Sequence, residues 1–134
     1  MLLFTHPACL QHVPGADHPE SPQRLQGVLD ALRGAFPGQL DWREAPSAKL
    51  GELARVHDTA MIDLVLQAQD APLRQIDLDT RTSPGSARAA LHAAGAGVAA
   101  VDAVVLGEDP VAFCAVRPPG HHATASHAMG FCLL

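Results

Sequence analysis

Hydrophobic and polar positions along the chain alternate between short apolar runs and longer helical stripes. Residues 2–5 form an apolar run that predicts a short first strand. In the segment HPESPQRL, which begins at His18, Ser21 is placed to cap a helix and Pro22 suits the first helical position. The apolar positions of that helix recur on one face until Gly34 ends it, at Leu25, Val28, Leu29 and Leu32.

Shorter elements are expected in the middle of the chain. Residues 40–45 predict a brief second strand, and Ser47 is placed to cap a short helix that carries Leu50 and Leu53. Asp58 is placed to cap a further helix, whose apolar positions are Ile62, Val65 and Leu66.

A long helix and a buried strand follow. The segment TSPGS at 82–86 repeats the Ser-Pro helix opening, and the apolar stripe after it is carried by Leu91, Ala94, Val98, Val101 and Val105. Residues 111–116, which include Phe113, form an apolar run typical of a buried strand. This order of elements predicts an α/β fold with a parallel sheet, formed by residues 1–134 without a linker that would divide them.

Composition and charge narrow the class of partner. The 134 residues are 48% hydrophobic and 17% charged, which indicates a globular core rather than disorder. The net charge of −5 and the lack of a lysine or arginine run argue against a nucleic acid or an anionic membrane as partner. Asp102 interrupts the weakly polar run at 89–107, which favours a helix of a soluble protein over a membrane span.

The cysteines bear on the cellular compartment. The chain has three cysteines, and no two of them are spaced as a C-x-x-C pair: Cys9, Cys114 and Cys132. The opening MLLFTH is too short and lacks the basic start of an export signal. We therefore expect reduced thiols and a cytoplasmic location.

Two further patterns have weak claims to a function. The segment GAGVAA at 95–100 matches a loose dinucleotide-binding fingerprint but lies inside the predicted long helix, where we expect it to allow close packing. The final loop carries only part of the spacing of a structural zinc site, at His121, His122, His127 and Cys132. The remaining histidines considered are expected at the surface or as hydrogen-bonded core residues, namely His6, His12, His57 and His92.

The strongest chemical signal is the loop AVRPPGHHATASHAMGFC at 115–132. Two prolines restrict the backbone and hold Arg117 extended, and Gly120 permits a sharp turn. His121 and His122 therefore follow the carboxyl end of a strand, which is where open α/β sheets bind ligands. Two imidazoles in contact resist carrying two protons at once, so one is expected to accept a proton while the other orients it. The alternative is an incidental His-His pair in a loop.

Arg24 occupies the third position of the first predicted helix, where its charge opposes the helix dipole. We therefore expect an acidic partner or a bound anion beside it. The alternative is an exposed arginine whose charge is held by water.

Four segments together resemble the N-terminal part of the histone deacetylase family, in particular its bacterial and class II members and the acetylpolyamine amidohydrolases. They are HPESPQRL, VHD at 56–58, DTRTSPGSARAALHAAGAG and AFCAVRPPGHHATASHAMGFC. The resemblance extends over nearly the whole chain in the family's order. It implies the N-terminal part of an arginase/deacetylase-like, three-layer α/β fold with a mainly parallel sheet.

The resemblance also implies roles for individual residues. His122 would be the general base and then the general acid, with His121 as its electrostatic partner. Gly130 would offer its carbonyl to the substrate amide, and Phe131 and Pro119 would line a narrow tunnel. Arg24 would lie beside a channel through which acetate leaves. The same motif contains two residues to which we assign a structural role, His18 and Glu20.

The activity implied is that of a zinc-dependent amidohydrolase that removes acyl groups from acetyl-lysine or acetylpolyamine-type substrates. The family's zinc ligands and its catalytic tyrosine lie beyond the GFC motif, so the ligands are expected downstream of Leu134, and the chain contains no tyrosine. We expect residues 1–134 to be the N-terminal part of one deacetylase-like domain, truncated after that motif and active only in a complete parent.

Two alternatives of a different class stay open. One is a catalytically inactive fragment that acts as a binding or self-associating module, which includes a homo-oligomer. The other is a small autonomous zinc-binding protein.

Overall fold

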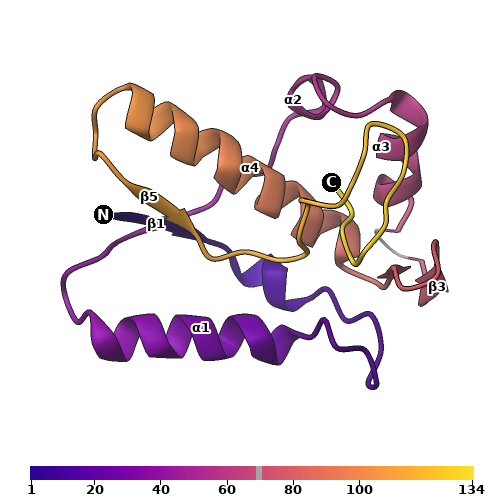
Figure 1. Cartoon of the computed structure of the whole chain (residues 1–134), viewed down its shortest axis with the longest axis horizontal. Coiled ribbons are helices and arrows are strands. Elements are labelled where there is room, and N and C mark those ends of the chain that lie inside the picture. The colour runs from indigo at the N-terminus through magenta and orange to yellow at the C-terminus, as the bar shows by residue number, and fades with distance from the viewer. Residues whose placement is uncertain (69–70) are drawn as a thin grey trace.

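The structure is a computed structural model that describes residues 1–68 and 71–134, and its centre is a parallel sheet. Strands β1 (Leu2–Thr5), β2 (Asp41–Glu44) and β5 (Ala112–Cys114) pair in the order β2-β1-β5. Helix α4 (Ser86–Val105) covers one face of this sheet and helix α1 (Pro22–Ala35) the other (Figure 1). The α/β class and the parallel sheet are therefore confirmed.

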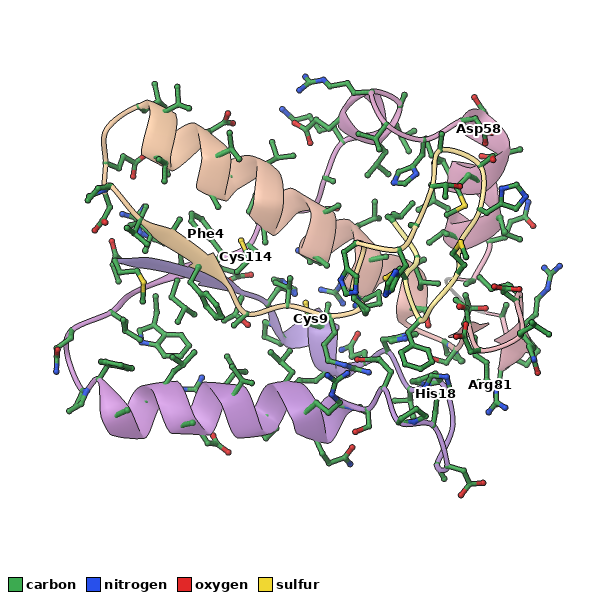
Figure 2. The ribbon with its side chains drawn as sticks, in the orientation of Figure 1. Phe4, Cys9, His18, Asp58, Arg81 and Cys114 are labelled. Carbon is green, nitrogen blue, oxygen red and sulfur yellow. The ribbon has the colours of Figure 1, made fainter. Side chains whose placement is uncertain are left out.

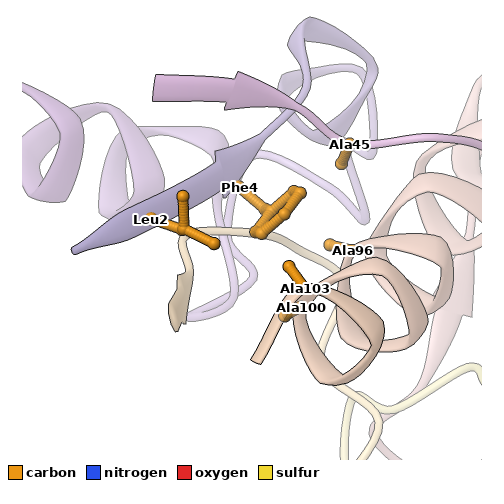
Figure 3. Close-up of a cluster of buried hydrophobic side chains, with 6 residues drawn as sticks. All are labelled: Leu2, Phe4, Ala45, Ala96, Ala100 and Ala103. Atoms are coloured by element: carbon orange, nitrogen blue, oxygen red, sulfur yellow. The ribbon is translucent and has the colours of Figure 1, made fainter. Parts of the chain in front are cut away.

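Strand β1 is buried on both faces, which explains why its sequence is a continuous apolar run. Leu3 faces α1, where it packs with Leu25 and Leu29. Leu2 and Phe4 point the other way and contact Ala45 and three small residues of α4, namely Ala96, Ala100 and Ala103 (Figure 3). Because successive side chains of a strand alternate between faces, four residues are enough to join the two helical layers.

Helix α1 follows the prediction closely. Ser21 is its N-cap residue and Pro22 its first residue, although among the described residues the Ser21 side chain makes no capping hydrogen bond. Leu25 and Leu29 are buried as predicted, whereas Val28 is 43% exposed. The helix passes through Gly34 and ends at Ala35, so the predicted end was wrong by one residue.

Helix α4 begins later than predicted and buries a different face. Its N-cap residue is Gly85, with φ +88°, and not Ser83 of the Ser-Pro pair. The predicted stripe was wrong at its end, because Val101 is 62% and Val105 78% exposed. The residues that face the protein are mostly alanines, because small side chains let the helix approach the sheet closely.

Gly95 shows how close that approach is. A Cβ atom at Gly95 would lie 2.0 Å from the carbonyl oxygen of Pro46. In the same contact the Ala48 amide donates a hydrogen bond of 3.0 Å to the Leu91 carbonyl. GAGVAA therefore lies inside α4 and serves close packing, as predicted. By length and composition α4 would also suffice for a membrane span, but here it packs on the sheet.

Short elements complete the fold: helix η1 (Pro7–Leu10), helix α2 (Leu50–Leu53), helix α3 (Thr59–Leu66) and a hairpin of β3 (Arg74–Gln75) and β4 (Arg81–Thr82). Asp58 caps α3 as predicted and accepts a 2.8 Å hydrogen bond from the Met61 amide. The prediction of Ser47 as the cap of α2 was wrong, because the N-cap residue is Lys49. The η1 helix and the hairpin were not predicted, since neither is long enough to show a period.

Candidate active site

A cavity of about 540 Å³ lies at the carboxyl end of β5. The loop at 115–134, which leaves β5 and runs toward α3 (yellow in Figure 1), forms one wall. All six residues predicted for substrate binding, catalysis or product release line this cavity: Arg24, Pro119, His121, His122, Gly130 and Phe131. The tertiary structure therefore gathers residues that are up to 107 positions apart, from Arg24 to Phe131.

His121 and His122 contact each other at the edge of the cavity. Their ring centroids are 4.3 Å apart and the ring planes meet at 60°, an edge-to-face arrangement. Both side chains are exposed, so solvent and a substrate can reach them. In an irregular loop, unlike a strand, two neighbouring side chains can turn toward one cavity. The pair can therefore act as one unit on a molecule bound there.

The position of His122 is set by the segment around Gly130. A Cβ atom at Gly130 would lie 2.9–3.0 Å from three atoms of the His122 side chain, and Gly130 has φ +57°. A larger residue would therefore displace the ring. The His122 amide also donates a 3.3 Å hydrogen bond to Sγ of Cys132, which is buried.

Gly120 has a different role from the one predicted. Its φ is not among the positive values, so the sharp turn does not depend on glycine there. Instead, a Cβ atom at Gly120 would lie 2.2 Å from the carbonyl oxygen of Leu134. Glycine is needed because two segments of the loop approach each other closely.

Phe131 forms part of the cavity wall and has an unusual backbone. Its φ is +71°, in the left-handed region that residues with a side chain seldom adopt. The Phe131 ring meets the ring of His18 edge-to-face at 4.8 Å. His18 lies in the loop before α1, close to the hairpin that carries Arg81 (Figure 2), and donates a 2.9 Å hydrogen bond from Nε2 to the Asp79 carbonyl. The structural role predicted for His18 fits these contacts.

Beneath the loop lies a buried ion pair that sequence patterns did not reveal. Arg117 and Glu20 are both almost fully buried, and two guanidinium nitrogens donate to the two carboxylate oxygens at 2.7 and 2.5 Å. A third Arg117 nitrogen donates to the Cys9 carbonyl at 2.8 Å. Arg117 was predicted only to be extended by the prolines. Its partner lies 97 residues away, so no local pattern could have indicated the pair.

His12 belongs to the same buried network. Its Nδ1 lies 2.7 Å from Oγ of Ser86, and its Nε2 lies 3.5 Å from a carboxylate oxygen of Glu20. Burial lowers the pKa of His12 to about 4, and the neighbouring charge of Glu20 offsets only part of that effect. His12 is thus a hydrogen-bonded core residue, one of the two predicted possibilities.

Arg24 lies at the open side of the cavity with 64% of its side chain exposed. Its guanidinium is 4.0 Å from the carboxylate of Glu20. The acidic partner expected for an arginine at this helix position is therefore present. The Glu20 carboxylate is bound much more closely by Arg117 than by Arg24. The Arg24 guanidinium can therefore still bind an anion.

Asp79 also lines the cavity, although the sequence analysis predicted no role for it. Its Oδ1 accepts a 3.1 Å hydrogen bond from the Gly130 amide, and its side chain is otherwise exposed. Asp79 lies within the segment DTRTSPGS, quoted for its family resemblance, but one aspartate beside a weak hairpin carries no pattern of its own.

A complete metal site is not formed by residues 1–68 and 71–134, which contain no group of three or more His, Cys, Asp or Glu side chains able to hold an ion. The possible ligands of the final loop do not converge. Nδ1 of His127 lies 2.7 Å from Oγ of Ser126, while Cys132 is buried against the His122 amide. The described residues therefore do not fit a self-contained zinc centre.

These features define a class. The chain is a parallel α/β domain whose candidate site lies at the carboxyl end of the sheet, the edge at which such sheets bind ligands. The comparisons with known proteins make the class specific. The model of the histone deacetylase domain matches residues 18–134, and the chain therefore belongs to the histone deacetylase domain family.

Individual relatives agree with this assignment. The chain is 37% identical over 126 residues to the histone deacetylase-like amidohydrolase of Pseudomonas aeruginosa, covering 94% of this chain and 32% of that protein. It is 37% identical over 123 residues to histone deacetylase 15 of Arabidopsis thaliana, covering 90% and 22%. The crystal structure of the HDA15 HD domain superposes with a TM-score of 0.93 at 34% identity, covering 99% of this chain and 40% of that one. The chain thus spans well under half the length of these relatives.

Proposed function

We propose that this chain supplies the acid–base histidines and part of the substrate tunnel of a zinc-dependent amidohydrolase. The reaction would remove acyl groups from acetyl-lysine or acetylpolyamine-type amides, within a longer parent polypeptide. The observation that carries the proposal is the contact between His121 and His122 at a cavity that also contains the other four predicted residues. Membership of the histone deacetylase domain family supports the hydrolase lineage.

The paired imidazoles suit proton transfer during amide hydrolysis. The two ring centroids are 4.3 Å apart, so both rings can act on the same bound molecule. An imidazole suits this work because it can accept a proton as a base and later donate it as an acid. We assign that work to His122, whose ring is held against Gly130, and assign to His121 the stabilisation of the resulting charge.

The rest of the cavity suits a slender acylated chain. Phe131 and Pro119 offer apolar surface to the methylene groups of a lysine or polyamine. The Gly130 carbonyl would accept a hydrogen bond from the substrate amide. Arg24, largely exposed beside the same cavity, would attract the carboxylate product.

Zinc enters this proposal through family membership alone. Because the described residues do not form a ligand set, we propose that the zinc ligands come from outside residues 1–134. When bound, the ion would polarise the amide and lower the pKa of a water.

A fusion protein tests the proposal. Leu134 would be joined to the part of the Pseudomonas aeruginosa amidohydrolase that follows its region of similarity, and the purified fusion would be loaded with zinc and given acetyl-lysine and acetylpolyamine substrates. We expect hydrolysis of at least one substrate by the fusion, and a rate lower by roughly 10²–10⁴-fold for its His121→Ala, His122→Ala double variant. A folded, zinc-loaded fusion without activity would contradict the proposal.

A second candidate function is favoured by the sheet edge. Among the described residues β5 pairs only with β1, and the buried strand predicted at 111–116 is instead partly exposed, with Phe113 at 45% and Val111, just before the strand, at 52%. Such an edge suits a self-associating module without catalysis. The two candidates differ in the fusion experiment, because a binding module has no reason to confer hydrolysis.

A further inference from the structure

We propose that Thr80 is a positioning residue that, together with Asp79, holds the turn at Gly130 and Phe131 and thereby places the ring of His122. The hydrogen bonds that join Asp79 and Thr80 to Gly130 and Phe131 form what we call the Thr80 clamp. Its consequence for catalysis rests on the proposed function, whereas its consequence for the geometry of the loop does not.

The clamp consists of three hydrogen bonds. The Phe131 amide donates to Oγ1 of Thr80 at 3.0 Å, and the Gly130 amide donates to Oδ1 of Asp79 at 3.1 Å. The Thr80 hydroxyl donates to the same Asp79 oxygen at 3.0 Å. An amide can only donate, so the Thr80 oxygen must be the acceptor from Phe131, which leaves its hydrogen for Asp79. The hydroxyl is thus both a hydrogen-bond acceptor and a hydrogen-bond donor, and a methyl group can be neither.

The turn needs such support because two successive residues have positive φ. Gly130 adopts +57° without steric cost, but Phe131 adopts +71° with a side chain. An unfavourable backbone conformation of this kind persists only where its surroundings impose it. The two amides held by the clamp are those of the same two residues, so the hydrogen bonds act where the strain lies.

The turn is in direct contact with His122. The His122 ring approaches the Gly130 backbone so closely that a Cβ atom there would lie 2.9 Å from its Cδ2. Cys132, the residue after the turn, accepts a hydrogen bond from the His122 amide. A shift of the turn would therefore move the His122 ring in two ways. Gly130 contacts the ring directly, and Cys132 is hydrogen-bonded to the His122 backbone.

The opposite end of the clamp is firmly placed. Thr80 is fully buried, and its carbonyl accepts a 2.9 Å hydrogen bond from the Ile76 amide across the hairpin. The carbonyl of Asp79 accepts the 2.9 Å hydrogen bond from Nε2 of His18. The clamp thus connects the β3–β4 hairpin to the loop at 115–134, over a separation of 51 residues in the sequence.

Hydrogen exchange and NMR of the 134-residue chain test the clamp without any need for activity. Thr80→Val keeps the shape of the side chain and removes the hydroxyl, whereas Thr80→Ser keeps the hydroxyl. Thr82→Val makes the same change at a second buried threonine of the hairpin and serves as the matched control. The readouts are amide exchange at Gly130 and Phe131 and the ring resonances of His122.

We expect Thr80→Val to speed exchange of the Phe131 amide by roughly fivefold or more, as for the loss of one buried hydrogen bond, and to shift the His122 ring resonances. Thr80→Ser should restore both toward the wild type, and Thr82→Val should leave both unchanged. A folded Thr80→Val chain with wild-type exchange at Phe131 and an unmoved His122 ring would overturn the proposal.

Asp79→Ala keeps the test decisive if Thr80→Val does not fold, because the Asp79 side chain is exposed. It should speed exchange of the Gly130 amide and shift the His122 ring; unchanged values for both would overturn the clamp. In the active fusion, Thr80→Val should lower kcat more than it raises KM, and Thr80→Ser should recover kcat. An inactive fusion with intact exchange effects would overturn the proposed function and leave the clamp standing.

Discussion

His122 lies in a loop, outside any helix or strand, and its position is set by contacts with a few individual residues. Its ring contacts His121 on one side and the Gly130 backbone on another, and its amide is held by the sulfur of Cys132. At Gly130 a side chain would meet the His122 ring, so glycine is required there. At the scale of the residue, the proposed chemistry therefore depends on a small set of side chains in one loop.

We predict that His122→Ala in the active fusion lowers amide hydrolysis by roughly 10²–10⁴-fold while zinc stays bound, as for the loss of a general base. His121→Ala should also lower kcat. Because the two rings act as a pair, the double variant should be little slower than the worse single variant. Steady-state kinetics with zinc analysis measures these effects, and a fully multiplicative loss would argue against coupled roles.

Arg24→Ala is expected to slow turnover more than it destabilises the fold. The side chain is 64% exposed and its contact with Glu20 is long, at 4.0 Å, so its loss should cost less than about 1 kcal/mol of folding free energy. Melting temperature and kcat of the fusion, measured on the same preparation, decide the matter. A large fall in melting temperature with unchanged kcat would make Arg24 a structural residue.

His12 predicts a pH dependence of stability. Burial depresses the pKa of folded His12 to about 4, whereas the unfolded chain protonates near 6.5. Below pH 6.5 the unfolded state therefore binds the proton that the folded state refuses, and stability falls as the pH drops toward 4. The contribution lost between pH 7.5 and pH 5 is about 2 kcal/mol.

Urea unfolding of the 134-residue chain at those two pH values measures this loss. The His12→Asn variant is the control, because it removes the titrating ring while other groups, including His6 with its lowered pKa, continue to contribute. The variant should lose less stability than the wild type between the two pH values. Equal losses would show that His12 is not the source.

At the scale of the element, helix α4 packs closely against β1 and the segment that follows β2. Its small residues lie against β1, and Gly95 lies against the segment that follows β2. The larger residues Val101 and Val105 remain exposed on another face of the same helix. The helix therefore stabilises the fold mainly by close packing of small side chains on the sheet, and less by burying large side chains.

Two glycines of α4 provide a matched test of that view. Gly95→Ala should lower the free energy of unfolding by about 1–3 kcal/mol, because its Cβ atom would overlap the Pro46 carbonyl. Gly97→Ala meets no atom within 4 Å and should raise it by about 0.5–1 kcal/mol through helix propensity. Thermal or urea unfolding of both variants measures the difference. Similar effects at the two positions would mean that the close contact at Gly95 does not matter for stability.

At the scale of the whole molecule, the sheet formed by the described residues has two edge strands, β2 and β5. Among the described residues β5 pairs with β1 alone, and the half-exposed side chain of Phe113 lines the cavity. An apolar strand edge of this kind readily pairs with another strand. The cavity and the edge are adjacent, so whatever covers the edge would also change the candidate active site.

We predict that the isolated 134-residue chain associates through this edge, holds no zinc tightly and does not hydrolyse acetyl-lysine substrates. A catalytic zinc site normally needs three protein ligands, which the described residues do not assemble. Size-exclusion chromatography, metal analysis and a fluorogenic deacetylation assay measure the three properties. Stoichiometric zinc together with deacetylation would contradict the prediction.

A charge on the edge separates specific association from general stickiness. Phe113→Lys should shift the chain toward the monomer, because a lysine on an edge strand resists pairing. Val56→Lys is the matched control, since Val56 is an exposed apolar residue outside the sheet. Equal shifts for the two variants would mean that the β5 edge is not the site of association.

The sequence by itself determined those features whose cause is local. The apolar run of β1, the Pro22 start of α1 and the Asp58 cap of α3 follow from period and capping, which act over a few residues. The His-His pair was likewise evident, because it follows two prolines that restrict the backbone. Their meeting with Arg24 around one cavity was expected only through the family resemblance.

Tertiary structure alone decided the features that depend on residues far apart in the chain. The buried face of α4 is set by how closely the sheet approaches, so the stripe of larger residues was misleading. Arg117 meets Glu20 across 97 residues, and Thr80 meets Phe131 across 51. A hydrogen bond needs two atoms about 3 Å apart, and no pattern in the sequence near one partner records where the other will lie.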